Sequence, residues 1–223
     1  MSDNLISCEL KLSGFKDHFV MGLNLMERFS DSFRANIVVA VSDRSVEALQ
    51  TFVSKDCSFT IYGINGEKKT IFGMITEIYF RDTAGDRSLV ELVIEPKLAK
   101  ASFGRQRKIY QDKSAVEIVE AVLSQSGITL DKSKLTGSSA KREYCVQYDE
   151  SDLNFVKRLM ASEGIGYFFS HSGSKSNLTL CNSKSAYVGK NNSASGPALS
   201  LGHFGGSGRS DETSFSSLEL EHT

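Results

Sequence analysis

The dipeptide Asn65-Gly66, placed between two short runs of β-type residues, constrains the fold more than any other feature of this sequence. The runs cover residues 58–63 and 70–75. Asparagine followed by glycine tolerates the positive φ angles of a tight turn, so the pattern predicts a β-hairpin. Alternation then continues to Arg81 and resumes over residues 89–94. Several short antiparallel strands that share one apolar face close most economically into a barrel or a sandwich.

The segment before this hairpin contributes to the same predicted barrel. Residues 33–41 are rich in β-branched side chains and predict a strand. A short helix is expected over residues 46–53, capped by Asp43 or Ser45. Residues 1–100 are therefore predicted to form an N-terminal antiparallel β barrel.

A smaller α+β module is predicted over residues 101–183, because helical periodicity now appears between short strands. Ser114 and Glu117 form a capping-box pattern at the start of one helix. Asp149 or Ser151 is expected to cap a second helix. The apolar stripes are Val116, Val119, Val122 and Leu123 in the first helix, and Leu153, Val156, Leu159 and Met160 in the second.

The strands of this module are also predicted from alternation. Tyr144, Val146 and Tyr148 alternate with Glu143, Cys145 and Gln147, so the aromatic face of this strand is expected to be buried and the other face polar. Two further runs, residues 167–169 and 178–180, are expected to form a hairpin.

Residues 184–223 differ in composition from the rest, since they are rich in Gly and Ser. They are expected to form a loop followed by the start of a truncated β region near residues 218–220. The predicted fold class is therefore α+β and mainly β. It has an N-terminal antiparallel barrel, a smaller module with two helices, and a second barrel that is incomplete.

Composition narrows the functional classes. The chain carries 26 Lys and Arg against 27 Asp and Glu, so its net charge is close to zero and creates no overall electrostatic field that would attract nucleic acid or an anionic membrane. It has no run of about 18 apolar residues and no basic N-terminal region followed by an apolar stretch, so synthesis in the cytoplasm without a signal peptide is expected. The cysteines lack CxxC spacing and are expected to be free, mostly buried thiols: Cys8, Cys57, Cys145 and Cys181.

No residue is predicted to be catalytic, to bind a cofactor or to ligate a metal. Cys145 and His171 would suit covalent catalysis, but they are expected in mid-strand and at a hairpin tip, without a third orienting group. Asp149, Glu150 and Asp152 are interpreted as acids that stabilise a helix N-terminus, and not as a hydrolytic or metal-binding cluster.

The remaining candidate ligand clusters are also interpreted as structural. A basic stretch interleaved with aromatic residues could contact phosphates and bases locally, but a solvated face or a subunit contact is favoured. Histidines lack partners at ligand spacing, and the glycines of residues 202–208 follow no strand. The basic stretch comprises Lys97, Lys100, Arg105, Arg107 and Lys108 with Phe103 and Tyr110, and the histidines are His18, His203 and His222.

Residues 142–169 resemble the signature of VgrG proteins. The segment reads REYCVQYDESDLNFVKRLM and continues, after two residues, through EGIGYFF. Residues 107–119, which read RKIYQDKSAVEIV, are similar to the stretch that leads into the first helix of that family. The resemblance is specific over about residues 105–170 and looser over the β-rich start.

The resemblance implies a structural hub of a type VI secretion spike, similar to the baseplate hub of contractile-tailed phages, and not an enzyme. Three copies would form a hollow ring that presents pseudo-sixfold symmetry to the hexameric Hcp tube. A needle on the other side would contact the target membrane, and baseplate proteins and effectors would be further partners. The machine would inject the protein, and neither a small-molecule substrate nor nucleic acid is expected.

The sequence departs from the family pattern in two respects. It carries no needle, and the residues after position 183 cannot complete the second barrel, so a fragment or a truncated product is expected. It also lacks a bulkier apolar residue, such as tryptophan, near residues 98–101. Two alternatives stay open: the hub of a phage tail or extracellular contractile particle, and a hydrolase that uses Cys145.

Overall fold

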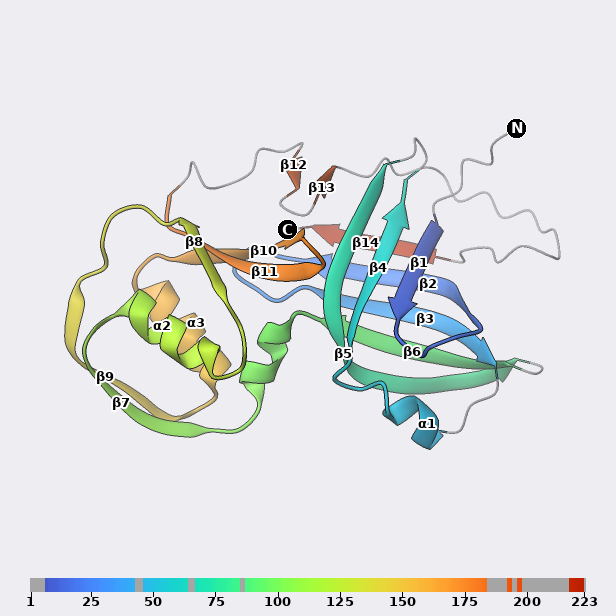
Figure 1. The fold of residues 1–223 in the computed structure, drawn as a ribbon, viewed down its shortest axis with the longest axis horizontal. Coiled ribbons are helices and arrows are strands. Elements are labelled where there is room, and N and C mark those ends of the chain that lie inside the picture. Colours follow the sequence, from blue (N-terminus) through green and yellow to red (C-terminus); the bar gives the residue numbers. More distant parts are fainter. Residues whose placement is uncertain are drawn as a thin grey trace.

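The computed structural model describes residues 7–42, 46–63, 67–84, 87–183, 192–193, 196–197 and 217–222. Within these ranges the chain is mainly β and has two parts, a curled sheet and a smaller α+β module beside it (Figure 1). This arrangement confirms the predicted mainly β, α+β fold class.

A seven-stranded sheet curls into a half-barrel in the strand order β1-β4-β5-β6-β3-β2-β14. All neighbours are antiparallel except β14 and β2, which are parallel. The predicted barrel is thus a half-barrel that gains one strand from the C-terminal segment. Its strands are β1 (Ser7–Leu12), β2 (His18–Glu27), β3 (Arg34–Ser42), β4 (Asp56–Tyr62), β5 (Lys68–Ala84), β6 (Arg87–Glu95) and β14 (Ser217–His222).

Two local predictions in this sheet have different outcomes. Tyr62 pairs with Lys68, which confirms the β4–β5 hairpin, although Asn65-Gly66 lies outside the described residues. Helix α1 (Val46–Gln50) follows β3 but is shorter than the predicted residues 46–53. Its predicted caps, Asp43 and Ser45, also lie outside the described residues.

Strand β5 accounts for the curl, because its first half pairs with β4 and its second half pairs with β6. Two bulges interrupt the pairing with β6, and bulges increase the local twist of a sheet. Gly73 lies where the two pairings meet. A Cβ atom there would lie 2.7 Å from Ile94 Cγ2 and 2.8 Å from the carbonyl oxygen of Glu95. Only glycine allows this close approach without a shift of the neighbouring strand.

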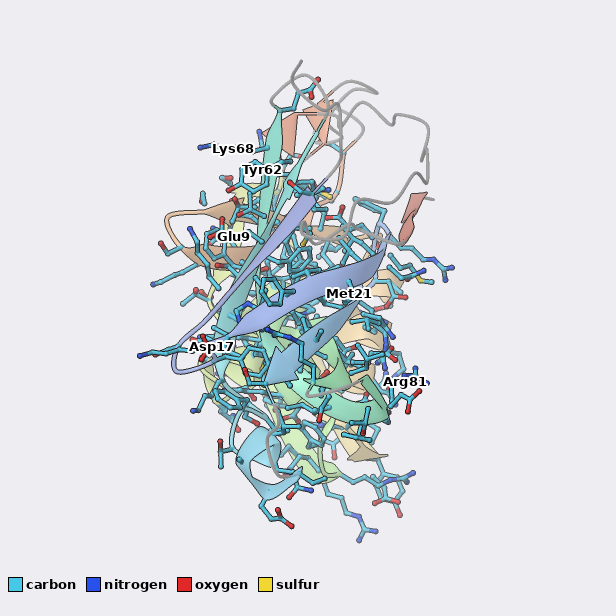
Figure 2. The ribbon with its side chains drawn as sticks, turned by 90° about the vertical axis from the view of Figure 1, so that its right-hand side faces the viewer. Glu9, Asp17, Met21, Tyr62, Lys68 and Arg81 are labelled. Carbon is cyan, nitrogen blue, oxygen red and sulfur yellow. The ribbon has the colours of Figure 1, made fainter. Side chains whose placement is uncertain are left out.

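The core of the half-barrel lies inside the curl. Figure 2 looks onto this end of the molecule, with β1 and β2 crossing in front of the other strands. Tyr62 there donates a hydrogen bond to Glu9 Oε2 at 2.9 Å, which links β4 to the edge strand β1. The buried side chains include Leu10, Leu12, Leu23, Leu25, Ile37, Val39, Phe59, Ile61, Ile71, Val90 and Leu92.

The α+β module begins after the 3-10 helix η1 (Lys97–Ser102). Its helices α2 (Ala115–Ser124) and α3 (Asp152–Ser162) pack against each other and against a two-stranded ribbon, which Figure 1 shows along their outer side. The ribbon consists of β7 (Gln106–Ser114) and β9 (Lys141–Glu150), and a three-stranded sheet has the order β10 (Gly166–Ser172), β11 (Lys175–Cys181), β8 (Leu130–Lys134). The short strands β12 (Asn192–Ser193) and β13 (Gly196–Pro197) pair with each other.

Both helices start at the predicted kind of cap. The Ser114 hydroxyl accepts a hydrogen bond from the backbone N–H of Glu117, and the Glu117 carboxylate accepts one from the Ser114 N–H at 2.7 Å. This confirms the predicted capping box. At α3 the cap is Ser151, which accepts from the Asn154 N–H at 3.2 Å, and not the alternative, Asp149.

The buried face of β9 is opposite to the predicted one. Tyr144 and Tyr148 are exposed, whereas Cys145 and Gln147 are buried beneath the helices. Burial of Gln147 is tolerated because its amide donates to Asp152 Oδ1 at 2.7 Å and to the Glu150 carbonyl. The prediction followed hydrophobicity alone and was therefore wrong.

A loop between β2 and β3, residues 28–33, binds the module to the half-barrel, and we call this contact the clasp. The Ser30 N–H donates to the Tyr167 carbonyl at 2.8 Å, and Lys157 Nζ of α3 donates to Asp31 Oδ1 at 2.7 Å. The Phe33 ring meets the Phe169 ring edge-on at 5.6 Å. Because the buried side chains of both parts form one continuous apolar cluster, the two parts pack as a single unit.

Candidate assembly surfaces

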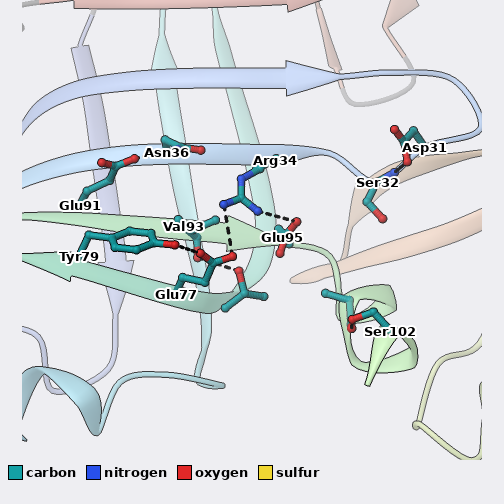
Figure 3. Close-up of polar contacts among 12 residues, drawn as sticks. Asp31, Ser32, Arg34, Asn36, Glu77, Tyr79, Glu91, Val93, Glu95 and Ser102 are labelled. Carbon is teal, nitrogen blue, oxygen red and sulfur yellow. Dashed lines mark hydrogen bonds and ion pairs between the residues drawn. The ribbon is translucent and has the colours of Figure 1, made fainter. Parts of the chain in front are cut away.

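The outward face of the half-barrel carries an ordered network of charges, shown in Figure 3. Arg34 of β3 lies between Glu77 of β5 and Glu95 of β6, with nitrogen–oxygen distances of 3.3 and 3.4 Å. The Tyr79 hydroxyl donates to the Glu77 carboxylate. This hydrogen bond and the Arg34 guanidinium lower the pKa of Glu77, so the carboxylate stays ionised.

A second network on the same face centres on Glu91, which is only 5% exposed. Its carboxylate accepts from Asn36 Nδ2 at 2.5 Å and from Arg81 Nε at 2.6 Å. Because three neighbouring strands supply these side chains, the sheet fixes their positions. A groove of about 500 Å³ lies beside them, lined by Gly22, Leu23, Asn24, Met26, Arg34, Asn36, Val38 and Glu91.

These networks were not predicted, although the sequence carries a signal for them. Arg34, Asn36 and Glu91 each stand between two apolar residues of a strand, and Glu77 is followed by one. Polar residues at alternate positions of a strand indicate a face that is not part of the core. A polar, pre-ordered face of this kind is suited to a specific protein contact, because its side chains lose little freedom on binding.

The structure places Cys145 and His171 in different surroundings. Cys145 lies opposite Tyr110 in the ribbon and is 7% exposed. His171, near the end of β10, accepts a hydrogen bond at Nδ1 from the Phe72 N–H at 3.2 Å, and its ring lies 5.4 Å from that of Phe33. Burial lowers the pKa of His171 to about 4. The two side chains therefore contact different parts of the fold and do not form a nucleophile–base pair.

The three acids that might have formed a hydrolytic cluster have separate partners. Asp149 pairs with Arg105 at 3.3 Å, and Glu150 pairs with Arg158 at 2.6 Å. Asp152 lies in the first turn of α3, as predicted, and accepts from Gln147. Their geometry is that of a helix start flanked by ion pairs.

The basic stretch does not form one continuous track. Lys97 pairs with Asp56 of the half-barrel at 2.8 Å, whereas Lys108 donates to Gln125 Oε1 at 2.8 Å. Tyr110 stacks on Phe155 at 5.7 Å and is half-buried, so it is not available to stack on a base. Arg105 and Arg107 both approach Asp149. Lys100 and Phe103 are exposed.

The remaining candidates are the cysteines and histidines. Cys8, Cys57, Cys145 and Cys181 are unpaired, and burial raises the pKa of Cys8 and of Cys57 to about 12. His18 Nε2 lies 3.2 Å from the Leu10 carbonyl oxygen. Within the described ranges, no three His, Cys, Asp or Glu side chains gather closely enough to hold a metal ion. The side chains of His203 and His222 and the predicted glycine-rich loop, residues 202–208, lie outside the described part.

Among the helices of the described ranges, none is long and apolar enough to cross a membrane.

A curled half-barrel joined to a small α+β module resembles the fold of phage tail hub proteins. The chain belongs to the phage tail baseplate hub (GPD) family, whose model matches residues 26–217. Its fold is similar to that of the E. coli c3393 protein, with a TM-score of 0.69 and 25% identity, over 81% of this chain and 50% of that one. The c3393 protein is a component of the type VI secretion system and is structurally similar to the T4 bacteriophage tail proteins gp27 and gp5.

Two curated relatives come from Vibrio cholerae. The chain is 30% identical to the type VI secretion system spike protein VgrG3 over 186 residues. This match covers 78% of this chain and 18% of VgrG3. The chain is 27% identical to the actin cross-linking toxin VgrG1 over 184 residues, and this match covers 78% of this chain and 17% of VgrG1. The chain thus spans less than a fifth of either relative. These matches confirm the VgrG resemblance and support a structural hub or spike role.

Proposed function

We propose that this chain is the hub portion of a type VI secretion spike, which assembles as a trimer between the Hcp tube and a membrane-puncturing needle. In this proposal residues 1–100 are the barrel domain, residues 101–183 the module, and residues 184–223 lead into a further β region. The hub is a scaffold without catalysis of its own, and it is exported by the contractile machine. Baseplate proteins and effectors are its further partners.

The observation that carries this proposal is the clasp between the two parts. Residues 28–33 bind the module through Ser30, Asp31 and Phe33, so the two parts pack as one unit, which suits a structural scaffold. The charged outward face of the half-barrel supports the same role. Symmetry repeats one such contact around a ring.

The test is the solution mass of the chain, measured by light scattering across a concentration series. We expect a species of three times 24.5 kDa. Arg34→Glu should weaken it, because the reversed charge disrupts the network with Glu77 and Glu95. Lys175→Glu, in the exposed β10–β11 turn, is the matched control. A monomer at every concentration would contradict association through this part of the chain.

The same fold would serve a phage tail or an extracellular contractile particle. Binding of purified Hcp rings by the trimer separates the secretion spike from these alternatives, since Hcp belongs to the secretion tube. The hydrolase alternative depends on an accessible Cys145 thiol. Slow alkylation of the native chain at neutral pH, with fast alkylation after unfolding, would argue against it.

A further inference from the structure

The outward side of the β7–β9 ribbon carries large apolar side chains where a sheet usually faces water. We call this side the ribbon face. The four most exposed large apolar side chains in the described part lie on it or just before it: Phe103 (73%), Tyr148 (73%), Ile109 (60%) and Tyr144 (56%). The opposite side of the ribbon is covered by α2 and α3. Antiparallel sheets with one covered side normally carry polar residues on the other, so this face is an exception.

The register aligns Ile109, Tyr144 and Tyr148 into one continuous stripe. Ile109 lies opposite Val146, and Gln111 lies opposite Tyr144. Arg107 lies opposite Tyr148, and its guanidinium stands 5.4 Å from the centre of the tyrosine ring. Opposite residues on one face of an antiparallel pair are in contact. The ribbon face is formed by Arg107, Ile109, Gln111 and Lys113 of β7 and by Tyr144, Val146 and Tyr148 of β9.

The charges on this face all have one sign. Arg107 lies at one end and Lys113 lies at the other, whereas none of the seven positions is acidic. Arg107 approaches Asp149, a carboxylate outside the face, at 3.6 Å. Arg142 opposite Lys113 is turned to the helix side, where it pairs with Glu163 at 2.6 Å and donates to Ser162 Oγ at the end of α3. Lys113 forms no ion pair with any residue in the described ranges. An aromatic centre between cations has the composition of a protein interface, in which Tyr and Arg are enriched.

The arrangement disfavours two other occupants. A two-fold contact with a second copy would place the same face against itself and bring like charges together. Single-stranded nucleic acid would need a groove that follows its backbone, but the cations stand at the two ends of an apolar stripe.

We propose that the ribbon face docks a partner protein that presents apolar side chains flanked by carboxylates. The apolar stripe supplies the buried centre of the contact, and Arg107 and Lys113 pair with the carboxylates at its rim. This contact is separate from the trimer proposed above, because it uses the end of the molecule away from the half-barrel (Figure 1).

The test is fluorescence anisotropy of the full chain with three labelled probes. One is a 12-residue peptide with leucine and phenylalanine placed among glutamates, the second carries lysine in place of each glutamate, and the third is a 12-nucleotide oligodeoxythymidylate. The variant Ile109→Ser/Tyr148→Ser removes the centre of the face. The variant Val53→Ser/Phe80→Ser removes two exposed apolar side chains elsewhere and is the matched control.

We expect the glutamate peptide alone to bind, and the Ile109→Ser/Tyr148→Ser change to weaken it by about tenfold or more. The control variant should bind as the parent does, and added salt should weaken the complex. The proposal is overturned by equal binding of the lysine peptide, by preferred binding of the oligonucleotide, or by no binding of the glutamate peptide up to millimolar concentration. It is also overturned if the Ile109→Ser/Tyr148→Ser variant loses self-association, since the face would then be a contact between copies.

Discussion

Acidification should loosen the joint between the half-barrel and the module, because His171 is buried there without charge. Its Nδ1 atom accepts the Phe72 N–H, and its ring packs against Phe33. Burial lowers its pKa to about 4 from the ordinary 6.5, with Glu27 acting against this shift and Lys69 adding to it. The native state therefore resists protonation of this ring.

The sign and size of the effect follow from linkage between protonation and folding. Because the native pKa is the lower one, the unfolded chain binds the proton first, and the stability present above pH 6.5 is lost as pH falls toward 4. Between pH 7 and pH 5 the loss is about 2 kcal/mol, and it reaches roughly 3 kcal/mol below the native pKa.

The assay is urea unfolding of the parent and of His171→Asn at pH 7 and pH 5. Asparagine keeps an oxygen acceptor for the Phe72 N–H but does not titrate. Carboxylates titrate in both proteins, so the difference between the two pH dependences reports His171 alone. We expect the parent to lose about 2 kcal/mol more than the variant. Identical pH dependences would refute a buried, neutral His171.

Three further substitutions test the packing, each by thermal melting. Gly73→Ala should lower the stability of the fold by about 1–3 kcal/mol, and by more than Gly166→Ala does. The reason is that the half-exposed Phe29 ring next to Gly166 can move, whereas the strand beside Gly73 cannot. A larger effect at Gly166 would contradict this account of the bend. Ser114→Ala should cost about 1 kcal/mol through loss of the α2 cap, and no change in melting would show that the capping box is not formed. Leu159→Asp, which buries a charge on α3, should cost about 4 kcal/mol or more, and unchanged melting would place that face in solvent.

Features fixed by local chemistry could be predicted from the sequence. The β4–β5 hairpin follows from Asn65-Gly66, and the start of α2 follows from Ser114 and Glu117, because these signals act over a few residues. The stripe of α3 was also predicted, although Phe155, which it omitted, is buried as well.

Features fixed by distant contacts could not be predicted. Tyr144 and Tyr148 lie with Val146 on the more apolar face of β9, yet the helices cover Cys145 and Gln147 instead. Which side of a two-stranded ribbon receives the helices depends on chain connectivity, and alternation alone cannot decide it. The same holds for the clasp, where Asp31 and Lys157 meet across 126 positions of the chain.

The parallel pairing of β14 with β2 has a consequence for the order of events during synthesis. Gly22 pairs with Ser217, so the outer edge of β2 lacks its β14 partner until residues 217–222 have left the ribosome. An open edge is a template for unwanted strand pairing, and contacts between such distant residues form slowly. The nascent half-barrel is therefore most exposed to aggregation before β14 arrives, and chaperones that shield β2 during translation should raise the soluble yield of this chain.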